Sequence, residues 1–123
     1  MKLHLDNNNF NNILWKFQKI DTLEFVSLND NVIDSKLPFE IDEYLSNLKF
    51  SYLTRNYFKG NILISFSLLK KLKVVDISKQ LNDNCSNRHN LTGSLLSFSS
   101  SPKSCQLKLG YNCLTGSIPE DFL

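Results

Sequence analysis

The residues of this chain that could do covalent or metal chemistry are few and widely spaced. The cysteines are Cys85, Cys105 and Cys113, and the histidines are His4 and His89. No two cysteines and no two histidines stand two to four residues apart, as paired ligands of a zinc site do. Neither a Gly-x-Ser-x-Gly elbow nor a glycine-rich phosphate loop is present. We therefore expect no metal site, no cofactor and no enzymatic activity.

The cysteines raise the question of a disulfide. Cys105 and Cys113 flank one expected strand, and the chain between them spans roughly 26 Å at about 3.3 Å per residue. A disulfide requires Cα atoms within about 7 Å, so these two should not pair with each other. Cys85 could reach either of them, and an odd number of cysteines also fits a partner outside this sequence.

Two glycosylation sequons occur close together. Asn84 begins Asn-Cys-Ser, and Asn90 begins Asn-Leu-Thr. Both asparagines are candidate glycosylation sites if the chain is secreted.

Charge and hydropathy exclude several classes of partner. The formal net charge is +2, too close to neutral for a nucleic-acid-binding surface. The largest basic run, residues 70–73, is most simply a solvated face. The longest apolar stretch, residues 62–69, is too short to span a bilayer, and the first ten residues lack the apolar core of a signal peptide. We expect one domain over residues 1–123, with no nucleic-acid partner and no direct membrane insertion.

A frame of leucines around one asparagine recurs along the whole chain. The last copy has leucine at 107, 109 and 114, asparagine at 112, glycine at 116 and Ile-Pro at 118–119. The asparagine position recurs at intervals of 23, 25 and 24 residues up to Gln80, and of 23 residues from His89 to Asn112. The offset from Gln80 to His89 is nine residues, which indicates a nine-residue insertion near 81–89. A period near 24 with this leucine frame is typical of leucine-rich repeats.

Each position of the frame has a structural role. Leucines two residues apart point the same way from a short strand, glycine permits a tight bend, and Ile-Pro favours an extended or 3₁₀ return path. The sequence therefore predicts an α/β-type repeat, a leucine-rich-repeat solenoid with short parallel strands on its concave face and a 3₁₀ or irregular convex side. The expected units are approximately 1–19, 20–44, 45–68, 69–101 with the insertion near 81–89, and an incomplete unit 102–123.

Asparagine can donate and accept hydrogen bonds at once, so stacked asparagines can satisfy the backbone groups left open where each strand turns away. The frame predicts a structural ladder of Asn8, Asn31, Asn56 and Asn112. At Gln80 the ladder should be interrupted.

The fuller pattern LxxLxxLxLxxNxLxGxIP, and above all Leu114-Thr115-Gly116-Ser117-Ile118-Pro119, resembles the plant-specific class of leucine-rich repeats. Proteins of that class form the extracellular parts of receptor-like kinases and receptor-like proteins, and the secreted polygalacturonase inhibitors. The resemblance implies a recognition module for a protein or peptide ligand, with a co-receptor as a further partner. It also implies an extracellular or plasma-membrane location, although this chain carries no kinase motif, signal peptide or transmembrane segment.

The chain also departs from that pattern. Only Pro38 and Pro119 fill the proline position, and neither end of the repeat carries a cap, so the chain looks like a fragment. Two alternatives stay open. The first is a free-standing interaction protein, similar to a polygalacturonase inhibitor or serving as an intracellular scaffold. The second is a non-functional gene fragment.

In such a repeat the residues that flank the core leucines project from the concave face. Exposed aromatic side chains among mixed charges suit protein or peptide recognition. Tyr52 and Arg55 are the preferred anchors. The predicted ligand-binding residues are Phe25, Ser27, Asn29, Phe50, Tyr52, Thr54, Arg55, Asp76, Lys108 and Tyr111.

Overall fold

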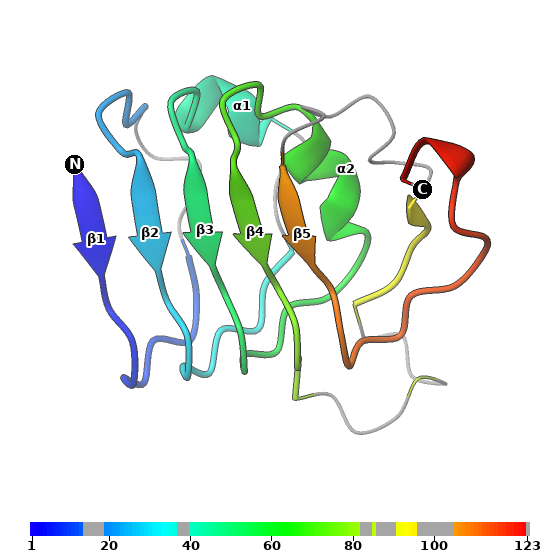
Figure 1. Ribbon diagram of the computed structural model, residues 1–123. Helices are drawn as coiled ribbons and strands as arrows, with labels where there is room; N and C mark the ends of the chain where they lie inside the picture. Colours follow the sequence, from blue (N-terminus) through cyan, green and yellow to red (C-terminus); the bar gives the residue numbers. More distant parts are fainter. Residues whose placement is uncertain (14–18, 37–39, 82–84, 86–90, 96–104, 123) are drawn as a thin grey trace.

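The strands of the chain form one five-stranded parallel sheet in sequential order, β1-β2-β3-β4-β5 (Figure 1). The computed structural model describes residues 1–13, 19–36, 40–81, 85, 91–95 and 105–122. With its few short helices, the arrangement is compatible with an α/β repeat fold. The strands are β1 (Lys2–His4), β2 (Phe25–Ser27), β3 (Phe50–Tyr52), β4 (Val74–Asp76) and β5 (Gln106–Lys108).

The register of the sheet confirms the alignment read from the leucine frame. The middle strand residues pair in the row Leu3, Val26, Ser51, Val75 and Leu107. These residues face the core, and the first and third residues of each strand face the opposite side, because successive side chains of a strand alternate. We call that opposite side the outer face of the sheet.

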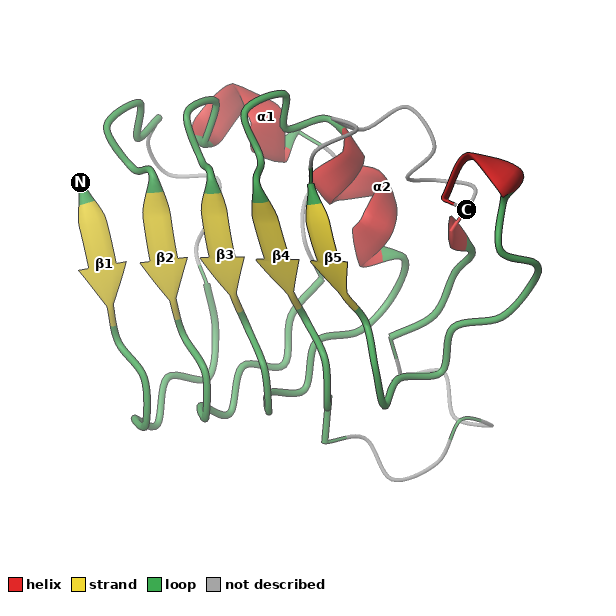
Figure 2. Cartoon of the chain, in the orientation of Figure 1, coloured by secondary structure: helices red, strands yellow, loops and turns green. Residues whose placement is uncertain are grey.

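Short helices lie on the core side of the sheet, behind the strands in Figure 2. They are α1 (Ile41–Tyr44) and α2 (Ile62–Ser67), whereas the 3₁₀ helix η2 (Glu120–Phe122) lies to the side of β5, near the C-terminus. Helix η2 follows Pro119, in agreement with the expected 3₁₀ return path. Helices α1 and α2 are α-helical, which the sequence pattern did not predict.

The hydrophobic core lies between the middle strands and the returning chain. Phe58, Phe66 and Ile33 are the largest of its fully buried side chains. The leucines of the outer strands, such as Leu3 and Leu107, are only partly buried. Burial is therefore greatest in the second to fourth units.

The asparagine side chains bond each unit to the one before it. Asn56 is fully buried, and its Nδ2 donates to the Leu28 carbonyl of the preceding unit at 2.9 Å. The same group donates to the Leu53 and Thr54 carbonyls of its own unit at 3.3 and 3.2 Å. Its Oδ1 accepts from the backbone N–H of Ile33 at 3.1 Å. Asn56 thus satisfies backbone groups in two units.

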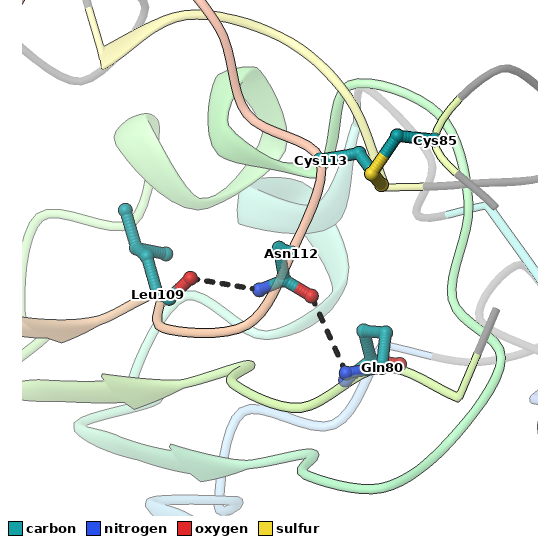
Figure 3. The surroundings of a disulfide bond; sticks show 5 residues. All are labelled: Gln80, Cys85, Leu109, Asn112 and Cys113. Atoms are coloured by element: carbon teal, nitrogen blue, oxygen red, sulfur yellow. Dashed lines mark hydrogen bonds between the residues drawn. A yellow bond between two sulfur atoms is a disulfide. The ribbon is translucent and has the colours of Figure 1, made fainter. Parts of the chain in front are cut away.

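The other predicted rungs follow with less burial. Asn31 makes the corresponding bonds between the first and second units. Asn112 donates to the Leu109 carbonyl at 3.0 Å and accepts from the Gln80 N–H at 3.3 Å (Figure 3). Asn8 is exposed, and among the described residues its side chain bonds to carbonyls of its own unit alone.

The predicted interruption of the ladder at Gln80 is wrong. Gln80 Nε2 donates to the carbonyls of Leu53 at 2.9 Å and Ile77 at 3.2 Å, and Oε1 accepts from the Phe58 N–H at 3.0 Å. The glutamine amide has the same donors and acceptor as asparagine. Its longer side chain is accommodated, so Gln80 serves as a rung.

The frame resumes after the insertion in the register that the spacing predicted. Leu91 forms a parallel bridge with Gly60, and the Thr92 N–H donates to the Gly60 carbonyl at 3.1 Å. The equivalent bond runs from the Thr115 N–H to the Gly93 carbonyl, also 3.1 Å. The fourth unit therefore returns to its place in the stack. Of the insertion itself, only Leu81 and Cys85 lie within the described residues.

Gly93 offers a test of this return path. It has φ +121°, and a Cβ there would lie 2.7 Å from Asn61 Oδ1. We expect Gly93→Ala to lower the free energy of unfolding by about 1–3 kcal/mol, because the change adds backbone strain and a close contact. Urea denaturation measures the effect. Gly110→Ala is the control, since nothing lies within 4 Å of a Cβ at Gly110, and an equal loss in both variants would contradict the prediction.

Candidate functional site

Four aromatic rings from three consecutive strands touch one another on the outer face. His4 lies 4.5 Å from Phe25, measured between ring centroids, and Phe25 lies 5.5 Å from Tyr52 and 6.2 Å from Phe50. His4 is exposed, and the other three rings are half-buried. Contacts between aromatic rings at these separations are favourable. We call these four residues the aromatic cluster.

The aromatic cluster contains three predicted ligand-binding residues and one that the prediction did not include. The predicted residues are Phe25, Phe50 and Tyr52, and the additional one is His4. The repeat could have identified His4, because His4 occupies the same position of its strand as Tyr52. His4 pairs with Ser27 in the sheet register, and Ser27 pairs with Tyr52.

Three other predicted contact residues use their polar groups inside the protein. Asn29 Oδ1 accepts from the Thr54 N–H and hydroxyl, both at 2.8 Å. The Ser27 hydroxyl donates to Asp6 Oδ1 at 2.7 Å. Ser27 and Thr54 retain only 5% and 7% of their surface exposed. Ser27 and Thr54 are therefore covered and bonded to residues of neighbouring units, which leaves these short side chains little surface for the predicted ligand contact.

Arg55, the second preferred anchor, is bonded to an acid at the same position of the preceding unit. Its Nε and Nη2 donate to the two carboxylate oxygens of Asp30. The hydrogen bond from Arg55 holds the pKa of Asp30 below its usual value, the charge of Arg55 adds to this, and burial acts in the opposite direction. The pKa of Arg55 is raised in turn, first by its hydrogen bond to Asp30 and further by the negative charges of Asp30, Asp76 and Asp6. The Arg55 side chain therefore forms an ion pair within the protein and is still exposed to solvent.

This ion pair predicts an acid-sensitive part of the stability. A carboxylate whose pKa is lowered by folding stabilises the folded state above its unfolded pKa, and that contribution is lost as the pH falls through the folded pKa. We expect the free energy of unfolding to fall more between about pH 6 and pH 2.5 in the wild type than in Asp30→Asn. Urea denaturation at both pH values measures this. Arg55→Met should reduce the pH dependence in the same way, and identical curves for all three proteins would contradict the assignment.

The remaining predicted contacts lie towards β5. Asp76 Oδ1 accepts from the Ser78 hydroxyl at 2.6 Å, and Lys108, its partner in the sheet register, is exposed. Tyr111 is 83% exposed. The Lys79 ammonium lies 5.8 Å from the centroid of the Tyr111 ring, within the range of a cation–π contact.

One backbone feature recurs three residues after every strand. The residue there adopts a left-handed conformation with φ between 50° and 59°. Asparagine and aspartate tolerate this conformation, whereas larger side chains do so at a cost. The first two units have asparagine or aspartate at this position, and the last three have larger side chains. The five residues are Asn7, Asp30, Arg55, Lys79 and Tyr111.

A disulfide joins Cys85 of the insertion to Cys113 of the last unit, with Cα atoms 5.3 Å apart (Figure 3). The prediction that Cys105 and Cys113 do not pair is confirmed, and of the two partners left open for Cys85 the structure has Cys113. Cys105 is a free thiol. Burial raises the pKa of its thiol.

The glycosylation candidates Asn84 and Asn90 lie outside the described residues. Within the part of the chain that the structure describes, no three acidic, cysteine or histidine side chains gather as metal ligands would. None of the helices described there is long and apolar enough to cross a membrane.

Comparisons with protein-family models, with curated proteins and with solved structures find no match for this chain. The geometry of the outer face therefore carries the functional argument.

Proposed function

We propose that this chain is a recognition module that binds a protein or peptide ligand on the outer face of its sheet. The aromatic cluster of His4, Phe25, Phe50 and Tyr52 is the observation that supports the proposal. The rings contact one another across three strands while keeping part of their surface exposed, and aromatic side chains gathered on an outward face are characteristic of interaction sites.

The proposed architecture is a leucine-rich-repeat solenoid of the plant-specific class. Parallel strands in sequential order, one amide rung for each strand and a left-handed residue after each strand support it. A stack of this kind offers an extended row of side chains from successive strands. By the resemblance of its motifs, the module is part of the ectodomain of a receptor-like kinase or receptor-like protein, with a co-receptor as a further partner.

The proposed location is extracellular. The disulfide between Cys85 and Cys113 supports it, because such bonds persist in oxidising compartments and are rare in reducing ones. The same observation favours a secreted module over an intracellular scaffold.

Selection of displayed random peptides on the disulfide-bonded chain tests the proposal. We expect peptides that bind the wild type and lose about five-fold or more in affinity for Phe50→Thr, since a large aromatic contact at an interface contributes about 1 kcal/mol or more. Threonine keeps the strand propensity of the position. Val32→Thr is the control, because Val32 is 42% exposed and belongs to no strand. A selection that yields only peptides indifferent to Phe50→Thr would overturn the proposed function.

A further inference from the structure

Lysines gather at the edge of the sheet where the strands begin, at the top of Figure 1. Lys2 opens β1, and Lys49 and Lys73 stand immediately before β3 and β4. Lys71 lies in the same approach to β4 and reaches back to Asn47 Oδ1 at 2.6 Å. We call these four lysines the amino-edge cluster.

The charge of the amino-edge cluster is only partly balanced. Lys49 forms an ion pair with Glu24 at 3.1 Å. Within the described residues, no carboxylate lies within ion-pair distance of Lys2, Lys71 or Lys73. The cluster therefore keeps an excess of positive charge.

Glu24 reports the sign of the field at this edge. Its pKa is lowered, first by the hydrogen bond and charge of Lys49, and further by the amino terminus and Lys71. Burial acts in the opposite direction. A carboxylate placed here is thus stabilised in its charged form.

The backbone places the lysines beside the strands that carry the aromatic rings, since Lys2 and His4 are the first and third residues of β1. Lys49 precedes Phe50, and the Lys73 N–H donates to the Lys49 carbonyl at 2.7 Å. Strands of a sheet lie about 4.8 Å apart, so a ligand crossing β1 to β4 travels roughly 14 Å. About five extended residues of a peptide cover that distance.

From this juxtaposition we infer that the ligand of the outer face is an acidic peptide, whose carboxylates meet the amino-edge cluster and whose apolar side chains lie on the aromatic cluster. The inference rests on the proposed function and adds the chemistry of the ligand. Charge complementarity selects the occupant, since unpaired ammonium groups favour an anionic partner and the adjoining rings favour an apolar one. A polyanion without apolar groups would use the lysines alone.

The same displayed peptide selection separates the two proposals. We expect the selected peptides to be rich in Asp and Glu next to aromatic or leucine residues. A synthetic copy of one selected peptide should bind Lys73→Gln about three-fold more weakly than the wild type, as removal of an exposed charge partner does. Binding should weaken similarly in 0.5 M NaCl because salt screens exposed charges. Isothermal titration measures both effects.

Lys36→Gln is the matched control, because it changes the net charge by the same amount as Lys73→Gln. Lys36 is exposed and lies beside Gly60, away from the amino-edge cluster. Peptides that require Phe50 but carry no acidic excess, or that bind Lys73→Gln and the wild type equally, would overturn the inference and leave the proposed function standing. If no selected peptide requires Phe50, both fail. Binding of heparin that Lys73→Gln weakens but Phe50→Thr does not, with no acidic peptide selected, would also overturn the inference.

Discussion

Replacement of Asn56 by alanine should lower the free energy of unfolding by about 1–3 kcal/mol, since a buried polar group left without a partner costs about that much. The Asn56 amide is fully buried and bonds to carbonyls of two units while accepting from Ile33. Removing it leaves the Ile33 N–H without a partner in an interior that water does not reach, whereas the Leu28 carbonyl keeps its bond from the Asn31 amide. Urea denaturation, analysed as one transition, measures the loss.

Asn8→Ala is the matched control for this prediction. Asn8 is exposed and bonds to the carbonyls of Leu5 and Asp6, which water can solvate once the amide is removed. We expect a loss of less than about 1 kcal/mol for this variant. Equal shifts for Asn8→Ala and Asn56→Ala would show that burial of the amide does not determine its contribution.

Removal of the disulfide is expected to have a similarly large effect. The Cys85–Cys113 bond closes a loop of sequence separation 28, and the chain-entropy model assigns about 3–4 kcal/mol of stability to a loop of that length. The double variant Cys85→Ser/Cys113→Ser should lose that amount in urea denaturation. Part of the loss should fall on the fifth unit, since Leu107 and Leu109 are only partly buried without further support.

Cys105→Ser distinguishes loss of the bond from loss of a cysteine. Cys105 is a free thiol, so this change should leave the stability within about 0.5 kcal/mol. The reduced wild type should unfold at the same urea concentration as the double variant. A double variant as stable as Cys105→Ser would mean that the bond does not stabilise the fold.

The sheet could be predicted from the sequence because its signal is repeated. Each Leu-x-Leu pair fixes which side of a strand is buried, and the asparagine that follows fixes where the strand ends. The pairing of Val75 with Leu107 across the insertion followed from the same frame. Helices α1 and α2 could not be predicted, since four- and six-residue helices carry too little periodicity.

The candidate site was predicted less completely because it depends on contacts between neighbouring units. The frame identifies residues that face outward, but the burial of Ser27 and Thr54 depends on the hydrogen bonds of Asp6 and Asn29. Gln80 was excluded from the ladder by residue type, although its amide offers the same chemistry. The pairing of Cys85 with Cys113 depends on the path of the chain through the insertion. The repeat pattern does not specify that path.

The ion pairs between the second and third units affect how two copies of this chain can associate. Glu24, Asp30 and Asp34 of the second unit pair with Lys49, Arg55 and Lys59 at the same positions of the third unit. Two second units brought side by side would instead oppose acid to acid at all three positions. Like charges placed directly opposite destabilise a sheet. The charge pattern therefore distinguishes the correct neighbour from a copy of the same unit, and during folding it disfavours pairing between identical units of two chains.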